Sequence, residues 1–149
     1  MRIAVGADHG GFPLNERVME ELRAAGHDVE DFGTHDGARA DDYPDYAVSV
    51  GQSVQSGRAD LGILICGSGV GASVAANKLR GVRAALCGDT YSAHQSREHD
   101  DCNVLCLGAR VVGVELASEI VRAFVNARFT GEERHRRRLA KITNIEKQG

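Results

Sequence analysis

Hydrophobic positions along the chain fall into two alternating patterns. Short, nearly continuous apolar runs predict buried strands, and longer stretches with apolar residues three or four positions apart predict helices. We expect strands at 2–5, 28–32, 61–66, 83–87 and 104–107. We expect helices at 13–26, 44–57, 72–79, 90–98, 114–129 and 132–147. Strands that alternate with helices are typical of a parallel sheet covered on both faces.

This order predicts an α/β fold, namely a Rossmann-like three-layer α/β/α sandwich around a five-stranded parallel sheet. No repeat or linker divides the chain, so we expect residues 1–149 to form one domain. The helix at 132–147 is basic and terminal, and we expect it to reach a neighbouring subunit. In the helix at 114–129 we expect a buried stripe formed by Leu116, Ile120, Val121, Phe124 and Val125.

Composition narrows the classes of function. The net charge of −3 gives no overall basic field, so we expect no nucleic-acid partner. No apolar segment approaches the roughly 18 residues of a membrane span, and the first residues read as a strand rather than a signal peptide. The four cysteines lie in or beside apolar runs, as reduced and buried thiols do. We therefore expect a cytoplasmic protein.

The segment Ile63-Leu-Ile-Cys-Gly-Ser-Gly-Val-Gly71 is the most informative part of the chain. It predicts a buried strand that ends at Cys66 and breaks into alternating glycines before a helix. Backbone N–H groups of such a loop can surround an anion, and donors of this kind favour a thiolate. Cys66 is therefore a candidate base or nucleophile. The alternative is a small core side chain, but its place directly before the glycines favours a chemical role.

Other polar residues are expected at the same edge of the sheet. Ligands of doubly wound sheets bind beyond the carboxyl ends of the strands. Asp8 and His9 follow the first strand, Asp89 the fourth and Arg110 the fifth, so we expect all four to face one crevice with Cys66. We also expect His99 near this edge, as a general acid or base. The structural alternatives are a helix cap for Asp8 and surface imidazoles for the two histidines.

Arg134 and Arg138 are four residues apart and so share one face of the last predicted helix. Two guanidinium groups on one face can clamp a phosphate. The alternatives are a solvated basic face or a contact with RNA. The absence of interleaved aromatic residues favours a phosphorylated small molecule.

Two other ligands fit part of the sequence. Gly67-Ser-Gly-Val-Gly-Ala72 matches G-x-G-x-x-A, with Asp89 at about the distance of a ribose-binding acid, as in dinucleotide sites. The motif does not follow the first strand, however, and no region remains for a substrate domain. A metal site is the other possibility, and its candidate ligands are His94, His99, Asp100, Asp101, Cys102 and Cys106. The spacing of the two cysteines is poor for zinc, so we expect no metal.

Several motifs together resemble one known family. They are Gly6-Ala-Asp-His-Gly-Gly11, Asp42-Tyr-Pro44, Ile65-Cys-Gly-Ser-Gly-Val-Gly71, Ala75-Ala-Asn-Lys78, Ser96-Arg-Glu-His99 and Arg134-His-x-x-Arg138. In order and spacing the chain resembles the type B ribose-5-phosphate isomerases, a group that includes galactose-6-phosphate isomerase subunits. The resemblance implies interconversion of ribose 5-phosphate and ribulose 5-phosphate through a cis-enediolate, in the non-oxidative pentose phosphate pathway and without a cofactor.

The resemblance also implies roles for individual residues. Cys66 matches the base that moves the proton between C1 and C2, and Ser68 belongs to the oxyanion cradle formed by Gly67, Ser68, Gly69, Val70 and Gly71. His99 matches the group that helps to open the furanose ring, and Asp8 matches a contact to sugar hydroxyls. The phosphate-binding set matches His9, Arg110, Arg134 and Arg138. The family's crevice lies between two subunits, so a homodimer or a dimer of dimers is implied.

Three positions bear on the choice of substrate and mechanism. One branch of the family has glutamate at the position of Ala72 and glycine at that of Cys66, so the cysteine mechanism is implied here. The family usually has asparagine where this chain has Asp100, a residue of the substrate-binding set, and a carboxylate there would repel an enediolate. An isomerase of a six-carbon sugar phosphate, such as allose 6-phosphate or galactose 6-phosphate, and a non-catalytic nucleotide-binding module remain the alternatives.

Overall fold

A computed structural model describes all 149 residues of the chain. Five strands form one parallel sheet in the order β2-β1-β3-β5-β4. The strands are β1 (Arg2–Ala7), β2 (Asp28–Asp31), β3 (Leu61–Cys66), β4 (Ala84–Leu86) and β5 (Val104–Gly108). The helices are α1 (Phe12–Ala24), α2 (Tyr43–Gln55), α3 (Val70–Ala76), α4 (Thr90–Asp100), α5 (Val114–Asn126) and α6 (Glu133–Gln148).

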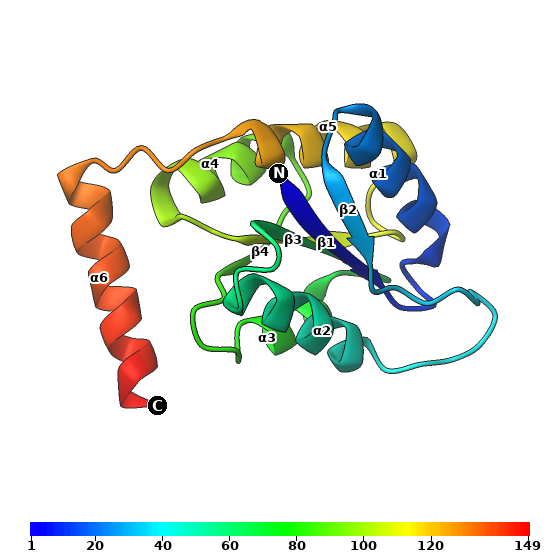
Figure 1. The fold of residues 1–149 in the computed structure, drawn as a ribbon, viewed down its shortest axis with the longest axis horizontal. Coiled ribbons are helices and arrows are strands. Elements are labelled where there is room, and N and C mark those ends of the chain that lie inside the picture. The colour runs from blue at the N-terminus through cyan, green and yellow to red at the C-terminus, as the bar shows by residue number, and fades with distance from the viewer.

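The sheet lies between two layers of helices, as the sequence predicts. Helices α1, α4 and α5 cover one face, and α2 and α3 cover the other (Figure 1). Each face has its own apolar cluster, because successive side chains of a strand point to opposite faces. Ile63 and Ile65 pack under α1 and α5, whereas Leu64 and Cys66 pack towards α2 and α3. The three-layer α/β/α fold is therefore confirmed.

The strand order places a switch point at the carboxyl ends of β1 and β3. These neighbouring strands feed helices on opposite faces of the sheet, since α1 follows β1 and α3 follows β3. Loops diverge at such a point, and the edge of the sheet where they do so is the usual ligand site of doubly wound sheets. We call this edge the crevice. A backbone hydrogen bond joins the ends of β3 and β5 at this edge. The N–H of Ala109 donates to the carbonyl of Cys66 at 2.9 Å.

The predicted helices differ from the observed ones by up to three residues at their ends, and two of them end three residues earlier than expected. Helix α3 ends at Ala76, where the side-chain amide of Asn77 bonds the first residue of β4. Asn77 Nδ2 donates to the carbonyl of Ala84, and Asn77 Oδ1 accepts the N–H of Ala84, so the chain turns there towards β4. Helix α5 ends at Asn126 rather than 129, where the Arg128 guanidinium donates to the carbonyls of Val125 and Ala127.

The prediction that Leu116 belongs to the buried stripe of α5 is wrong. Its side chain is exposed, and Ala117 takes the buried position beside Ile120 and Val121. The other four predicted members of the stripe are buried.

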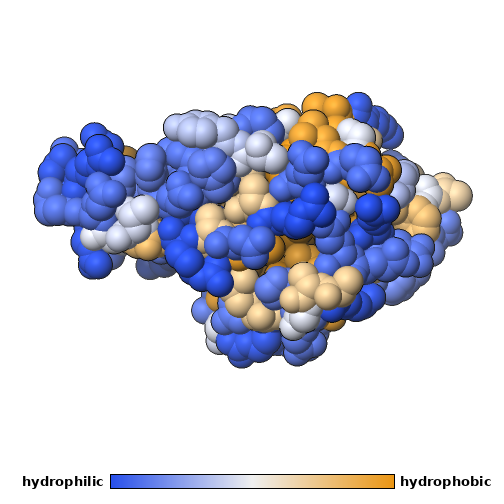
Figure 2. Space-filling model, turned by 90° about the horizontal axis from the view of Figure 1, so that it is seen from above, coloured by the Kyte–Doolittle hydropathy of each residue, from blue (hydrophilic) through white to orange (hydrophobic).

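Helix α6 stands apart from the rest of the molecule. Figure 1 shows it beyond the end of α4, joined to α5 by an extended segment. Its surface is mainly hydrophilic in Figure 2, although Ile142 and Ile145 are exposed apolar side chains on it. No helix of the protein combines the length and the apolarity needed to cross a bilayer.

Candidate active site

Cys66 is the last residue of β3, and its sulfur faces the glycine loop that follows. The N–H of Gly69 donates to Cys66 Sγ at 3.1 Å. The side chain is buried, with 5 % of its surface exposed. Hydrogen bonds from backbone N–H groups stabilise a sulfur that carries negative charge. The sulfur therefore lies at the floor of the crevice with a donor already aimed at it.

Two glycines of this loop leave no room for a side chain of their own. Gly69 has φ = +84°, in the left-handed region, and a Cβ on it would lie 2.6 Å from Leu86 Cδ1. A Cβ on Gly71 would collide with the ring of Tyr43. Because the loop carries no side chains at these two positions, its backbone can lie close to a ligand.

Ser68 is the exposed polar member of the loop. Its Oγ accepts the N–H of Val70 at 3.2 Å, which leaves the hydroxyl hydrogen free for a ligand. Gly108 lies directly beneath it, since a Cβ there would be 2.5 Å from the carbonyl oxygen of Ser68. The serine is thus held at the rim of the crevice by the end of β5.

The turn after β1 meets the same loop. A Cβ on Gly10 would lie 2.9 Å from the amide nitrogen of Gly67, and one on Gly11 would collide with the carbonyl of Ile65. The carboxylate of Asp8 is buried and accepts the N–H of Gly11 at 2.9 Å. Asp8 therefore closes the turn that leads into α1, whose N-cap residue is Gly11 and has no side-chain cap, so the helix-cap alternative for Asp8 is wrong.

Arg110 comes from the other side of the crevice, directly after β5. Its N–H donates to the carbonyl of Gly67 at 3.0 Å. Its guanidinium passes over Gly67, since a Cβ on that glycine would lie 3.2 Å from Nη1. Asp8, Cys66, the 67–71 loop and Arg110 therefore meet at one edge of the sheet, and His9 directly follows Asp8 there.

His9 is fixed by two residues that the sequence analysis did not single out. Its ring nitrogen Nδ1 lies 2.6 Å from Asp41 Oδ1, and the hydroxyl of Tyr46 donates to Asp41 Oδ2 at 2.7 Å. Burial alone would raise the pKa of Asp41, but the hydrogen bonds from His9 and Tyr46 outweigh it and lower that pKa. No periodicity in the 33–42 loop marks Asp41, so only the folded loop reveals this contact.

The expectation that His99 shares this edge is wrong within one chain. Helix α4 follows β4 and runs antiparallel to the strands, so its last residues come to the amino ends of the sheet. Asn103, just beyond it, accepts the N–H of Gly62 at the start of β3. His99 instead packs on α6: its ring lies 4.1 Å from that of His135, and its Nδ1 is 2.9 Å from the amide nitrogen of Gln95.

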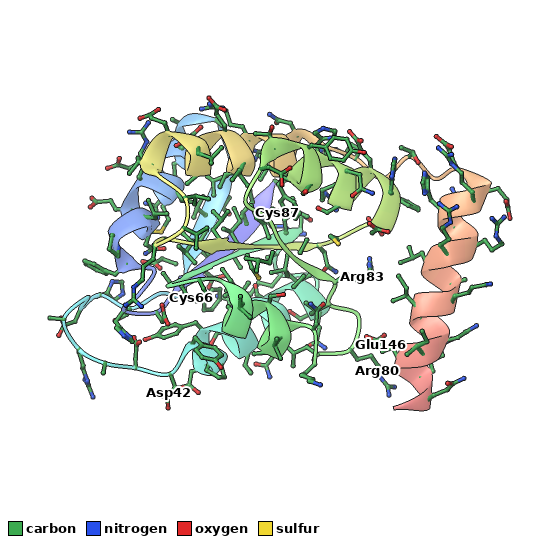
Figure 3. The ribbon with its side chains drawn as sticks, turned by 180° about the vertical axis from the view of Figure 1, so that it is seen from behind. Asp42, Cys66, Arg80, Arg83, Cys87 and Glu146 are labelled. Atoms are coloured by element: carbon green, nitrogen blue, oxygen red, sulfur yellow. The ribbon has the colours of Figure 1, made fainter.

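The remaining candidates form a second group around His99. Asp100 ends α4, and Arg134 and Arg138 lie one helical turn apart near the start of α6. Arg134 pairs with Glu132 at 3.1 Å. Figure 3 shows Cys66 and α6 at opposite sides of the molecule, with Arg83 and Glu146 marking the α6 side. The sequence-predicted site is therefore divided into two groups that one chain does not bring together.

Neither alternative ligand gains support from the geometry. The carboxylate of Asp89 accepts from the N–H of Ser92 (2.6 Å) and from its hydroxyl (2.8 Å), so it caps α4. Of the proposed metal ligands, His94 pairs with Glu98 and Asp101 pairs with Arg83. Burial raises the pKa of Cys102 to about 12 and also raises that of Cys106. These thiols are inert core groups.

Comparison with known proteins agrees with this arrangement. The family model described as Ribose/Galactose Isomerase matches residues 3–142. The chain belongs to the ribose/galactose isomerase family. It is 50 % identical to ribose-5-phosphate isomerase B of Escherichia coli, over 97 % of this chain and 96 % of that protein.

Solved structures agree as well. The ribose-5-phosphate isomerase B of Clostridium thermocellum matches with a TM-score of 0.96 and 49 % identity, over 99 % of both chains. That of Mycoplasma genitalium, solved with bound ribulose-5-phosphate, matches with a TM-score of 0.93 and 42 % identity, over 99 % of this chain and 97 % of that one.

Proposed function

We propose that this enzyme interconverts D-ribose 5-phosphate and D-ribulose 5-phosphate by proton transfer between C1 and C2 through a cis-enediolate. The observation that carries the proposal is the hydrogen bond from the N–H of Gly69 to Cys66 Sγ at the switch point. An α-proton is only weakly acidic, so its removal needs both a positioned base and donors for the developing oxyanion. The sulfur and the glycine loop supply both within one turn of chain.

The crevice residues divide the work of binding and chemistry. Cys66 acts as the base, and the N–H groups of residues 67–71, with the Ser68 hydroxyl, stabilise the enediolate oxygen. Asp8 contacts sugar hydroxyls. His9 and Arg110 bind the phosphate at the two sides of the crevice, because a dianion is held best by charged donors that converge on it.

The second group of residues serves the crevice of another copy of the chain. His99, Asp100, Arg134 and Arg138 project from the side opposite Cys66, on α4 and on the outlying α6. In a symmetric dimer the same patch is exchanged both ways, so each α6 can complete the other crevice. We therefore propose a homodimer, or a dimer of dimers, in which His99 opens the furanose ring and the two arginines clamp the phosphate.

Three further proposals concern the setting of the enzyme. Residues 1–149 act as a single isomerase domain, since one sheet and its two helical layers carry the Cys66 crevice and α6 follows α5 in the same chain. The mechanism proceeds without a metal or organic cofactor. The four cysteines are free thiols, which is typical of a reducing compartment such as the cytoplasm.

The test is turnover of ribose 5-phosphate to ribulose 5-phosphate. Replacing a general base lowers the rate by roughly 10²–10⁴-fold, so we expect that loss in kcat for Cys66→Ala. Cys106→Ala, a change at another buried thiol of the sheet, is the matched control. Wild-type kcat in Cys66→Ala would exclude the thiol as the base.

Because the family description names both ribose and galactose, six-carbon substrates form the second arm of the test. We expect kcat/KM to be higher for ribose 5-phosphate than for allose 6-phosphate or galactose 6-phosphate. Asp100→Asn restores the residue usual in the family and is assayed on the same substrates. A higher kcat/KM for a six-carbon substrate would reassign the enzyme within its family.

A further inference from the structure

The carboxylate of Asp41, in the loop between β2 and α2, contacts both the backbone and the ring of His9. Asp41 Oδ1 accepts the backbone N–H of His9 at 3.0 Å and lies 2.6 Å from its ring Nδ1. Asp41 Oδ2 accepts the hydroxyl of Tyr46 at 2.7 Å. The Asp41 side chain is only 18 % exposed. Both oxygens are thus occupied, and the contacts leave the carboxylate no freedom to turn away.

Tyr46 makes the arrangement rigid. It lies on the first turn of α2, and its Cβ packs against β1, 3.5 Å from the position of a Cβ on Gly6. Asp41 raises the pKa of the Tyr46 hydroxyl, which therefore stays a donor. The chain of contacts runs from the helix through the loop to the imidazole, and each link is a short hydrogen bond.

The contact decides what His9 can offer to a ligand. A carboxylate at Nδ1 keeps a proton on that nitrogen, so the neutral ring can have only the Nδ1–H tautomer. Nε2 is then the one ring nitrogen left for the crevice, and when it is protonated the ring becomes a cation.

We propose that Asp41 is a positioning residue of the active site, which holds His9 so that Nε2 is presented to the substrate phosphate as a charged donor. This inference rests on the proposed function, in which His9 binds the phosphate, and extends it to a residue outside the crevice. A carboxylate that hydrogen-bonds one ring nitrogen fixes both the tautomer and the orientation of an imidazole.

Other charged groups near the contact are few and can be named. Asp8 precedes His9, and Asp8, His9 and Asp41 together place their ligand atoms within 4.8 Å of one another. Arg39, Asp42 and Asp45 line the same surface hollow of about 450 Å³ as Asp41. Three such ligands are also able to hold a divalent cation, which would compete with the Asp41–His9 hydrogen bond. The experiment therefore includes a cation.

The decisive measurements are nitrogen NMR of the His9 ring and steady-state kinetics on ribose 5-phosphate. For the wild type we expect a proton on Nδ1 at every pH at which the ring is neutral. For Asp41→Ala we expect KM to rise roughly tenfold, with kcat within about twofold, because a hydrogen bond to a charged group is lost. Affinity for inorganic phosphate should fall in parallel.

Graded and control variants separate positioning from mere folding. Asp41→Asn keeps a neutral acceptor of the same shape, so we expect a KM between those of the wild type and Asp41→Ala. Tyr46→Phe removes the hydroxyl that orients Asp41 but keeps the carboxylate on His9, so we expect KM to rise only about threefold. Asp42→Asn changes the neighbouring exposed carboxylate, whose side chain makes no cap hydrogen bond, and should keep wild-type KM.

Three outcomes would overturn the inference. They are a wild-type His9 with its proton on Nε2, a wild-type KM for both Asp41 variants, and a stoichiometric Zn²⁺ site that Asp41→Asn abolishes. If Asp41→Ala does not fold, Asp41→Asn decides the question alone. If the wild type fails to isomerise ribose 5-phosphate, the proposed function is wrong, but the NMR and phosphate titrations still decide the role of Asp41.

Discussion

The imidazole rings of His99 and His135 lie face to face, with centroids 4.1 Å apart and 15° between their planes. This stack joins the end of α4 to the start of α6, where few other contacts hold that helix. His135 is buried, and no hydrogen-bond partner reaches its Nε2. The stacked rings therefore fix the position of His99, the proposed ring-opening residue, relative to Arg134 and Arg138, the proposed phosphate clamp.

The stack predicts that α6 loosens in acid. Burial, the nearby His99 and Arg134 together lower the pKa of His135 below its ordinary 6.5. As pH falls below about 6.5, the unfolded chain takes up a proton before the folded one, so this contribution to stability is present at neutral pH and is lost in acid. We expect faster proteolysis of the 127–132 segment at about pH 5.5 than at about pH 7.5.

The control for this prediction is His135→Gln, which cannot titrate. His27 also has a lowered pKa, caused first by burial, so His27→Gln is measured beside it. The same acid sensitivity in His135→Gln as in the wild type would show that the stack is not the cause.

Gly69→Ala should damage both stability and activity. An alanine here would have a left-handed φ, and its Cβ would collide with the side chain of Leu86. We therefore expect a loss of about 3 kcal/mol in the free energy of unfolding. The shift of the Gly69 N–H away from Cys66 Sγ should lower kcat by roughly 100-fold.

Gly26→Ala is the matched control, because Gly26 has φ = +89° with no atom within 4 Å of the new Cβ. We expect it to cost about 1 kcal/mol and to leave kcat unchanged. Urea denaturation and the isomerase assay together check both variants. Equal losses in the two would contradict the role given to the Gly69 N–H.

Cys66 should be the most reactive of the four thiols. Burial raises the pKa of Cys87 to about 11 and that of Cys102 to about 12, so both remain protonated at about pH 8. The sulfur of Cys66, in contrast, receives a backbone N–H. We expect iodoacetamide to label Cys66 first, as peptide mass spectrometry would show, and ribose 5-phosphate to slow the labelling. Preferential labelling of Cys87 would contradict this order.

The proposed dimer predicts complementation between two inactive variants. Cys66→Ala lacks the base, and Arg134→Ala/Arg138→Ala lacks the clamp. In a mixed dimer one crevice carries both defects and the other carries neither. After equal mixing and full exchange, half of the dimers are mixed and half of their sites are intact, so we expect about a quarter of wild-type activity. Light scattering on each sample checks the oligomeric state, and no recovery in a mixture of exchanged dimers would contradict shared sites.

The sequence predicted the sheet and the Cys66 edge because both depend on local signals. Apolar runs mark the strands, and Gly69 and Gly71 mark a loop where backbones must approach closely. His99 was misplaced because its position depends on the direction of α4, and only the complete path from β4 to β5 shows that this helix carries it away from Cys66.

The exposed Leu116 and the Asp41–His9 contact were missed for a different reason. Leu116 has the spacing of a buried residue, but the small Ala117 fills the place under α5 instead. Asp41 lies in a charged loop without periodicity, and its partner is 32 residues earlier in the chain. Contacts of this kind depend on tertiary packing, and no local pattern in a single sequence predicts them.

The close contact of Gly11 with the carbonyl of Ile65 limits how the substrate specificity of such an enzyme can change. The turn after β1 and the last residues of β3 meet without any side chain between them, so substitution can neither enlarge nor fill this part of the site. Longer or shorter sugars must be accommodated at the opposite wall, where side chains are free to vary. If the proposed dimer completes the crevice, new specificity in this scaffold is expected to arise at the proposed contact between two chains, and the residues that transfer the proton can remain unchanged.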